Sequence, residues 1–487
     1  MIDEGGGWFF FFLSARALHL FFFSTLITSP LFPPLFFSPP HRYNAYRFFV
    51  QSTRRWEAAH PGAGPFTPDP GAAAASKNVL DRWLAAASAD LARFVRAEMG
   101  AYRLYTVVPR LTAFIIDLTN VYVRYNRARL KGVGGGGEGK GAGPPPDDQL
   151  AALSALHATL ASLALVMSPF TPFFSEALWV NLRRCVPAAW AWPESVHWAD
   201  FPDPPEAAAG GGGEGGEAAV TAGVALMQAA IELARGVRDK HALPLRQPLA
   251  TLTLIHADPA ALAVLTPDLR AYIQAEANVG AVAESGDVGC WTSGRAVPDW
   301  AVLGSRLGPS MGRVAAGLKA ADAALLASIE AGHAITVAGV DLGPADVSVV
   351  RTFVRPGGEG APDGAGDPGT GLFIALDLAV DEALAEAGTA REVATRVQKA
   401  RKSAGLVAGE AVEVWLGGGA LHQAGAAPPL PPALAAALEA QAGWVAATLG
   451  GVPKALADLP AGRDELIREE HSLGAGDFVL VLSRPAA

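Results

Sequence analysis

The sequence predicts an α + α/β protein, with an all-helical bundle in the first half and a smaller mixed α/β region in the second. Two observations predict this division. Between residues 43 and 242, apolar side chains recur at three- and four-residue steps, the period of an amphipathic helix. After Pro244 the period changes to two, which is typical of strands with one buried face. Hydrophobic residues make up 51% of the 487 residues, enough for a core in each half.

The first 42 residues differ in composition from the rest. Residues 8–28 are apolar for long enough to span a bilayer. However, Arg16 lies in the middle of that stretch, where a charge is costly, and acidic residues precede it where a secretory signal needs basic ones. We interpret residues 1–42 as a translated pyrimidine-rich tract from an incorrect gene boundary. A membrane or targeting segment and a disordered tail are the alternatives.

Helix periodicity appears six times in the first half. The predicted helices are Tyr43–Arg55, Asn78–Glu98, 106–131, Leu150–Val166, Phe173–Arg184 and Ala218–Ala242, and residues 58–76 are predicted to be a loop. In the helix over 106–131 we expect Thr106 to be the N-cap, which would place Pro109 in the first turn. Charged residues recur there every seven positions, which predicts one buried and one charged face.

Strands are predicted in the second half, with helices between them. The predicted strands are Thr251–His256, Asp346–Phe353, Leu372–Val380, Ala411–Leu416 and Phe478–Ser483, and the predicted helices are 308–330, 388–404 and 432–449. Gly-rich stretches at 132–146, 206–217 and 357–371 are predicted to be loops.

Charge is unevenly distributed along the chain. Residues 78–131 hold nine basic and four acidic residues, a net +5 in a chain of net −9, so the remainder carries −14. The basic residues at the end of this segment are interleaved with Tyr122 and Tyr125. Guanidinium groups and aromatic rings together suit unstacked RNA bases. Residues 388–404 repeat the basic pattern, and the alternative for both segments is a solvated charged face.

The sequence predicts neither a catalytic residue nor a metal site. No two of the ten histidines have the four-residue helical spacing of a zinc site, and the two cysteines are too few for a cysteine cluster. Residues 134–141 (GGGGEGKG) approach a phosphate-binding loop, but no Ser or Thr follows the lysine to hold magnesium.

Several stretches of the chain resemble the C-terminal half of isoleucyl-tRNA synthetases of the cytosolic eukaryotic and archaeal type. They are YNAYR (43–47), NVLDRW (78–83), 102–132, MSPFTPFFSE (167–176), SVHW (195–198), 227–248, 303–314 and EAGTAREVATRVQKARKSAGL (386–406). MSPFTPF also occurs in the sister enzymes for valine and leucine. Val121 stands where the family usually has Trp.

The resemblance implies a domain organisation. It assigns 43–76 to the connection from the catalytic core, 77–205 to the anticodon-binding helical bundle, 206–217 to a linker, 218–310 to a helix continuing the bundle plus a small α/β unit, and 311–487 to a C-terminal α/β region. The family's ATP-binding Rossmann domain carries H-x-G-H and K-M-S-K-S. Neither signature occurs in this sequence; residues 399–403 (KARKS) only approach the second, within a predicted helix.

The resemblance also implies a function. We expect the chain to be the part of an isoleucine–tRNA ligase that binds the anticodon of tRNA(Ile) in the cytoplasm. ATP and Mg²⁺ would serve a complete enzyme with a catalytic domain in cis, and whether this chain is itself an enzyme stays open. The alternatives are a non-catalytic RNA-binding or scaffold protein derived from the synthetase, or a membrane-anchored protein through residues 8–28. The candidate tRNA-binding residues are Arg82, Trp83, Arg110, Arg124, Tyr125, Arg127, Arg129, Lys131, Arg391, Arg396, Lys399, Arg401 and Lys402.

Overall fold

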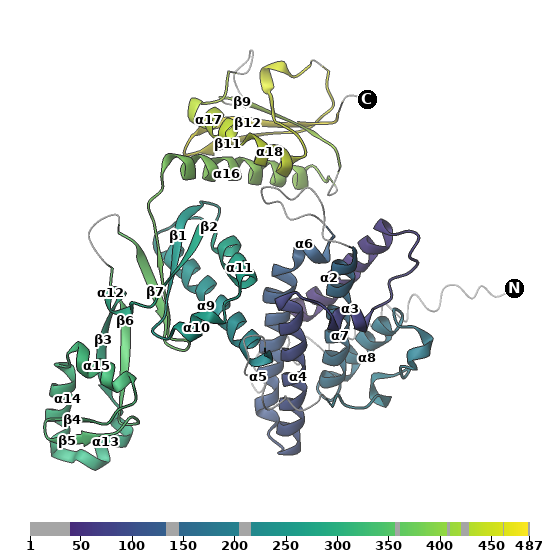
Figure 1. Ribbon diagram of the computed structural model, residues 1–487. Helices are drawn as coiled ribbons and strands as arrows, with labels where there is room; N and C mark the ends of the chain where they lie inside the picture. Colours follow the sequence, from purple (N-terminus) through teal and green to yellow (C-terminus); the bar gives the residue numbers. More distant parts are fainter. Residues whose placement is uncertain are drawn as a thin grey trace, which may run out of the picture. The chain divides into compact units, whose positions relative to one another are not determined.

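The computed structural model describes residues 39–132, 146–203, 216–355, 361–406, 410–419, 428–460 and 462–485. The chain divides into two compact units, with the boundary between Thr221 and Ala222. The first unit is a helical bundle and the second contains small mixed sheets (Figure 1). The predicted α + α/β class is therefore confirmed. The segment 8–28 lies outside the described residues.

The first unit is built around one central helix, α7 (Pro146–Met167), which contacts most of the other helices of the bundle. The others are α2 (Pro39–Ala59), α3 (Pro70–Ala74), α4 (Val79–Gly100), α5 (Leu104–Asp117), the π-helix η2 (Leu118–Val123), α6 (Arg127–Leu130), α8 (Pro172–Arg183) and the 3₁₀ turns η3 (Ala188–Trp190) and η4 (Val196–Trp198). α4 begins as predicted, because the Asn78 side chain accepts from the backbone N–H groups of Leu80 and Asp81. α3 lies within residues 58–76, where the sequence predicted a loop.

The helix predicted over residues 106–131 is interrupted. Thr106 is not its N-cap, because α5 begins at Leu104 and the Thr106 hydroxyl donates to Glu98 (2.6 Å). Pro109 therefore lies inside α5, on its exposed side, where water can reach the carbonyl that loses its partner. The π-helix η2 then separates α5 from α6, which changes the direction in which later side chains point.

By length and composition, two of the described helices could cross a membrane: residues 147–167 of α7 and the helix α9 (Glu217–Lys240). The apolar window of α7 is 72% buried inside the bundle. A core helix of a water-soluble protein passes the same test, so this is weak evidence for a membrane span.

The second unit begins with α9 and a four-stranded sheet of order β2-β1-β8-β7. Its elements are β1 (Leu249–Ile255), α10 (Pro259–Ala263), α11 (Pro267–Ala277), β2 (Val279–Ser285), β7 (Asp363–Asp367) and β8 (Leu372–Leu376). β1 is parallel to β2 and antiparallel to β8. α9 packs against α11 through the Arg235–Glu276 ion pair (2.7 Å), so most of α9 belongs to this unit instead of continuing the bundle.

A lobe with its own hydrophobic core is inserted between β2 and β7. It consists of α12 (Val288–Trp291), β3 (Thr292–Pro298), α13 (Trp300–Leu307), η5 (Gly308–Ser310), α14 (Met311–Lys319), α15 (Ala323–Glu330), β4 (Ile335–Val337), β5 (Val340–Leu342) and β6 (Val347–Phe353). β3 pairs with β6 and β4 with β5. The predicted domain boundary at residue 310 falls inside this lobe. The helix predicted over 308–330 is two helices, α14 and α15.

The last part of the chain forms a second four-stranded sheet, of order β10-β9-β12-β11. Its elements are α16 (Glu382–Ser403), β9 (Glu413–Gly418), α17 (Pro432–Ala440), α18 (Ala442–Leu449), β10 (Lys454–Ala455), η6 (Leu456–Asp458), β11 (Glu465–Leu473) and β12 (Gly476–Ser483). β9 is parallel to β10 and antiparallel to β12. This part therefore repeats the order of elements from α9 to β8, apart from the inserted lobe. Each series has a long helix, a strand, two helices, a strand parallel to the first and an antiparallel hairpin.

The two long helices of this repeated topology bury the same positions when they are aligned with a shift of 163 residues. The buried pairs are Met227 and Ala390, Ala230 and Val393, Ile231 and Ala394, Ala234 and Val397, and Val237 and Ala400. The chain leaves each helix in the same way. A residue with positive φ follows (Ala242 or Gly405), and the next backbone N–H donates to the helix, Leu243 to Arg238 and Leu406 to Arg401. The second unit thus contains two copies of one module.

The strand β7 lies within residues 357–371, where the sequence predicted a loop. It reads DGAGD and pairs antiparallel with β8. A Cβ at Gly364 would lie only 2.0 Å from the carbonyl oxygen of Ile374. The glycines that suggested a loop are therefore required by the close approach of two strands.

Candidate nucleic-acid interface

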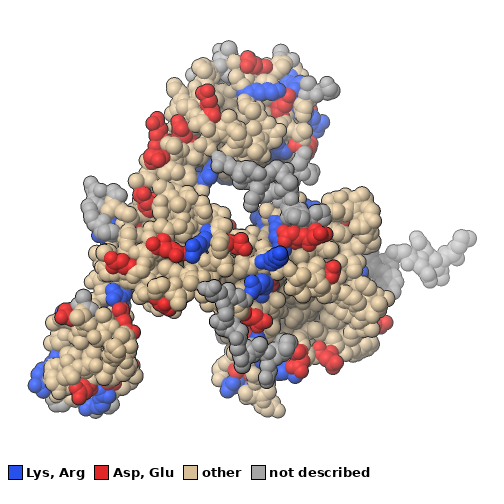
Figure 2. Space-filling view, viewed as in Figure 1, with Lys and Arg blue, Asp and Glu red and all other residues tan. Residues whose placement is uncertain are grey.

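Basic side chains of α2 and α6 approach one another in the first unit. The Arg127 guanidinium lies 5.8 Å above the ring of Phe48 on α2. Burial lowers the pKa of the Lys131 ammonium, and the nearby charges of Arg127 and Arg55 lower it further. Arg55 and Arg127 thus both act electrostatically on Lys131, and we call these three residues the basic cluster. On the face shown in Figure 2, Lys and Arg occur in small groups and form no continuous coat.

The sequence of α2 explains how the helix contributes to the basic cluster. Phe48, Phe49 and Trp56 are buried, which fixes the helix against the bundle. The opposite face exposes Arg47, Arg54 and Arg55. These three arginines were not among the predicted site residues. The signal was present, because Arg47 and Arg54 are seven positions apart and share a helix face.

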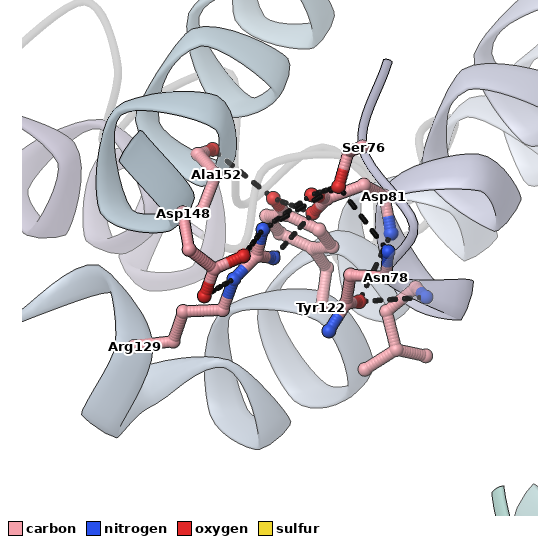
Figure 3. Close-up of polar contacts among 8 residues, drawn as sticks. Ser76, Asn78, Asp81, Tyr122, Arg129, Asp148 and Ala152 are labelled. Carbon is pink, nitrogen blue, oxygen red and sulfur yellow. Dashed lines mark hydrogen bonds and ion pairs between the residues drawn. The ribbon is translucent and has the colours of Figure 1, made fainter. Parts of the chain in front are cut away.

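Arg129 lies two positions from Arg127 but points into a buried polar group (Figure 3). Its guanidinium donates to both carboxylate oxygens of Asp81, at 2.8 and 2.7 Å, and through Nε to Asp148 (2.7 Å). Burial on its own would lower the pKa of Arg129, but the hydrogen bonds to Asp81 and Asp148 outweigh it and raise that pKa. The Arg129 side chain is only 10% exposed, so its hydrogen-bonding groups serve the fold.

Tyr122 belongs to the same buried group. Its hydroxyl donates to Asp81 (2.7 Å), and the residue is fully buried. The Asp81 carboxylate also accepts from the Ser76 hydroxyl (2.6 Å). These contacts hold η2 and α6 against α4 and α7. They therefore fix the backbone that carries Arg127 and Lys131.

The other predicted residues of the first unit lie in different surroundings. Trp83 is 5% exposed and packs in the core, so its ring is not available to a base. Arg124 lies over the half-buried ring of Tyr125, 6.0 Å from its centre. Arg82 and Arg110 are exposed on α4 and α5. The structure therefore brings together Arg127 and Lys131 with Arg55, and it does not bring Trp83 or Arg129 to the surface.

The second predicted group lies on α16, and several of its members contact other parts of their own unit. Arg391 hydrogen-bonds to Asn278 and lies 5.8 Å from the ring centre of Trp444. Arg396 pairs with Glu392 at 3.3 Å. Lys399 and Lys402 are exposed.

Arg401, also on α16, has a counterpart in the first module. It donates to the carbonyl oxygen of Glu410 (2.6 Å), as Arg238 does to that of Gln247 (2.9 Å). Both pairs are related by the shift of 163 residues. Arg238 is 1% exposed and also donates to Ala277 and Asn278, at the C-terminal end of α11. Burial lowers the pKa of Arg238 to about 10.

Within the described residues, no group of three or more His, Cys, Asp or Glu could hold a metal ion. Residues 308–312 read GPSMG, the pattern of a hydrolase nucleophile turn, but they connect α13 to α14 and no strand precedes them. A cavity of about 410 Å³ in the last module is lined mostly by apolar side chains, among them Leu438 and Val445. Neither the GPSMG segment nor this cavity brings several titratable side chains together.

Residues 81–254 match the sequence profile of the family described as the anticodon-binding domain of tRNA ligase. This match covers the first unit from α4 onward and continues through α9 into β1. The chain is also similar to cytoplasmic isoleucine–tRNA ligases, with 43% identity over 375 residues for the protein of Arabidopsis thaliana and 34% over 349 residues for that of Saccharomyces cerevisiae.

A probable cytoplasmic isoleucine–tRNA ligase of Dictyostelium discoideum is 36% identical over 373 residues. These matches cover 77%, 70% and 77% of this chain in the plant, yeast and Dictyostelium comparisons, but only 29%, 30% and 33% of the relatives. The chain thus spans about a third of the length of the curated relatives, and it aligns within their C-terminal half. The chain therefore carries an anticodon-binding domain of the tRNA ligase type and is related to the C-terminal half of cytosolic isoleucine–tRNA ligases.

Proposed function

We propose that this chain binds the anticodon arm of tRNA(Ile) as the anticodon-binding and C-terminal portion of an isoleucine–tRNA ligase. The observation that carries the proposal is the basic cluster of Arg55, Arg127 and Lys131, of which Arg127 and Lys131 lie in the segment that matches the anticodon-binding domain. Burial lowers the pKa of the Lys131 ammonium, and repulsion by the like charges of Arg127 and Arg55 lowers it further. Phosphate oxygens would remove that repulsion and gain three cationic partners.

The candidate residues would divide into two roles. Arg124, Arg127 and Lys131 would contact the RNA, together with Arg55, Arg54 and Arg47 of α2. Arg82 and Arg110, and Lys399 and Lys402 on α16, are exposed and would give further phosphate contacts. Arg129, Arg238 and Arg401 would instead be positioning residues, because their guanidinium groups bind carboxylates or carbonyl oxygens of the chain itself.

The complete ligase would add the parts that this chain does not contain. A catalytic domain in cis would bind ATP and Mg²⁺ and activate isoleucine, in the cytoplasm, as the names of the relatives suggest. No H-x-G-H sequence occurs in these 487 residues. We therefore expect the chain alone to give no ATP–pyrophosphate exchange with isoleucine, and exchange by this chain would contradict the assignment.

Fluorescence anisotropy with a labelled tRNA(Ile) transcript and the full chain tests the proposal. The logarithm of the association constant should fall linearly with the logarithm of salt concentration, by about 0.7–0.9 per phosphate contacted. The triple variant Arg55→Ala, Arg127→Ala and Lys131→Ala should make this slope shallower by about 2–3. Lys319→Ala, an exposed lysine of the inserted lobe, is the matched control and should change nothing. Absent or salt-independent binding would contradict the proposal.

A further inference from the structure

Two tyrosines are almost fully exposed at the turn between α4 and α5. Tyr102 is 90% exposed and Tyr105 is 76% exposed, with Leu104 between them at 50%. Large aromatic side chains normally bury most of their surface in a folded protein. Exposed apolar groups that lie together mark sites of interaction.

The turn that carries these rings is held by hydrogen bonds. Arg103 donates through Nε to Glu98 (2.9 Å), and the Thr106 hydroxyl donates to the same carboxylate (2.6 Å). The backbone N–H groups of Tyr102 and Arg103 donate to the carbonyl oxygens of Met99 (3.0 Å) and Glu98 (2.8 Å). Binding a ligand on such a turn costs little ordering of the backbone.

Tyr102 has a left-handed backbone, with φ of +58°. A glycine would adopt this conformation without the clash of a Cβ, and a bulky aromatic residue rarely does. The backbone of the turn thus gives no reason for a ring at this position. The Tyr102 ring lies almost entirely in solvent, so its presence at this position needs another explanation.

The charge around the turn favours a polyanion. Between Met99 and Ile116 the sequence holds Arg103 and Arg110 and no acidic residue. The Glu98 carboxylate beneath the turn is paired with Arg103, and the hydrogen bonds of Arg103 and Thr106 hold its pKa below the usual value. Arg110 is exposed about two turns further along α5.

The turn and the basic cluster lie at opposite ends of one helix. Asp81, in the first turn of α4, binds Arg129 of α6, whereas Tyr102 lies just beyond the C-cap of α4, Ala101. A helix of 22 residues is about 33 Å long. Only an elongated ligand can contact both ends, and an RNA stem with a single-stranded loop is such a ligand.

We propose that Tyr102 and Tyr105 form a stacking platform for the unpaired bases of an RNA loop, while the basic cluster holds the phosphates of its stem. This inference rests on the proposed tRNA-binding function and adds the residues that contact bases. Unpaired bases stack on exposed aromatic side chains whatever their sequence. Trp83 and Tyr122, two other aromatic residues of the segment 78–131, are buried and cannot do this, and Tyr125 is half-buried beneath Arg124.

The experiment compares variants of the full chain on two RNAs, a tRNA(Ile) transcript and a blunt RNA duplex without unpaired bases. Tyr102→Gly removes a ring at a position where glycine fits the backbone, so the fold should survive. Tyr105→Ala removes the other ring and Tyr105→Phe keeps it. Ile116→Ala, which trims an exposed residue of the same helix, is the matched control. Thermal unfolding of each variant verifies the fold.

We expect Tyr102→Gly and Tyr105→Ala each to weaken tRNA binding about 5- to 150-fold, the range of a lost stacked base. The salt slope should stay unchanged because no phosphate contact is lost. Tyr105→Phe and Ile116→Ala should bind as the unaltered chain does, and no variant should differ on the duplex.

Three results would overturn the inference. If the unaltered chain binds tRNA with the expected salt slope but both ring-removal variants bind equally well, the proposed function stands and the stacking platform is wrong. The turn would then be free for another partner, such as a protein surface. If the variants lose affinity for the duplex as well, the rings do not act on unpaired bases. If the unaltered chain does not bind tRNA, the proposed function fails first.

Discussion

Arg127 and Arg129 are two positions apart in one basic segment, and the fold gives them opposite surroundings. Arg127 is exposed and lies above the ring of Phe48 on α2. Arg129 is bound by Asp81 and Asp148 inside the bundle. Residues two apart on a helix point in different directions, so a basic run cannot present all its charges on one face. Which residue faces inward depends on the position of Asp81, which is 48 residues away in sequence.

This pair gives a prediction about Arg127 and Arg129. Arg129→Ala should lower the free energy of unfolding of the first unit by about 3–5 kcal/mol, because the carboxylate of Asp81 would be left buried without its partner. Arg127→Ala should leave stability within about 0.5 kcal/mol but weaken tRNA binding. Urea unfolding and tRNA binding of both variants check this, and equal effects of both on stability would contradict it.

A further prediction concerns which RNA group Arg127 contacts. If Arg127 reads a base, Arg127→Ala should cost about 1–3 kcal/mol with tRNA(Ile) and reduce discrimination against other tRNAs. If it holds a phosphate, the loss should be equal for all tRNAs and the salt slope should become shallower by about one. Competition between tRNA(Ile) and a second transcript distinguishes the two roles.

Asp363 predicts a pH dependence for the second unit. Burial would raise the pKa of Asp363, but hydrogen bonds from Lys240 and His241 (both 2.6 Å) outweigh it and lower the pKa to about 2. The folded state therefore favours the ionised carboxylate. The stability that it adds is fully present above the ordinary value of 3.8 and is lost as pH falls towards 2.

Asp363→Asn should accordingly lower the free energy of unfolding at pH 7 by about 1–3 kcal/mol. The difference from the unaltered chain should shrink as pH falls from about 4 towards 2. Asp458→Asn, at an exposed position, is the control. Urea unfolding at a series of pH values measures the difference, and one that does not change with pH would show that the charge of Asp363 is not responsible.

At the scale of elements, the repeated module explains arginines that look alike in sequence. α9 and α16 each carry an arginine in the last turns that binds the loop leading to the next strand. Arg238 is enclosed by the end of α11, which supplies the carbonyls of Ala277 and Asn278. The partial negative charge at that helix end takes the place of a carboxylate.

Arg238→Ala should therefore be more damaging than Arg401→Ala. Loss of Arg238 leaves several buried carbonyl groups without a donor, at a cost of about 1–3 kcal/mol for each group. Arg401 is half-buried and binds one carbonyl, so Arg401→Ala should cost about 1 kcal/mol. Thermal unfolding compares the two. If Arg401→Ala instead lost much tRNA affinity and little stability, Arg401 would be a residue that contacts the RNA.

At the scale of the whole molecule, the chain consists of two compact units, each with its own core. Unfolding of a chain with more than one such unit need not follow a single two-state transition. We expect calorimetry to resolve two transitions. Arg129→Ala should lower the temperature of one, and Asp363→Asn that of the other. A single transition lowered by both variants would show that the units unfold together.

The sequence was sufficient for the fold class and for most helices, because local periodicity reports which face of an element is buried. It missed β7 because a glycine-rich stretch is typical of a loop. Only the pairing with β8 shows that Gly364 lies too close to the carbonyl oxygen of Ile374 to carry a side chain. It also predicted an uninterrupted helix over 106–131, because a π-helix leaves little trace in an apolar repeat.

The candidate site was predictable in part. Local charge density identified the segment 124–131 as basic. The family resemblance added the expectation that this segment binds tRNA, which charge alone did not predict. The sequence could not show that Arg55 joins Arg127 and Lys131, because α2 and α6 are brought together only by packing around α7. Nor could it separate the buried Trp83 and Tyr122 from the exposed Tyr102 and Tyr105.

The sequence by itself determined the class of fold, the segment similar to anticodon-binding domains and the relation to cytosolic isoleucine–tRNA ligases, because these depend on the order and spacing of residues along the chain. Only the tertiary structure decided which basic and aromatic side chains reach solvent and that one module occurs twice. Those properties depend on contacts between residues far apart in sequence, such as Asp81 with Arg129 and Lys240 with Asp363. The burial pattern along one helix or strand does not show which residues of another element contact it.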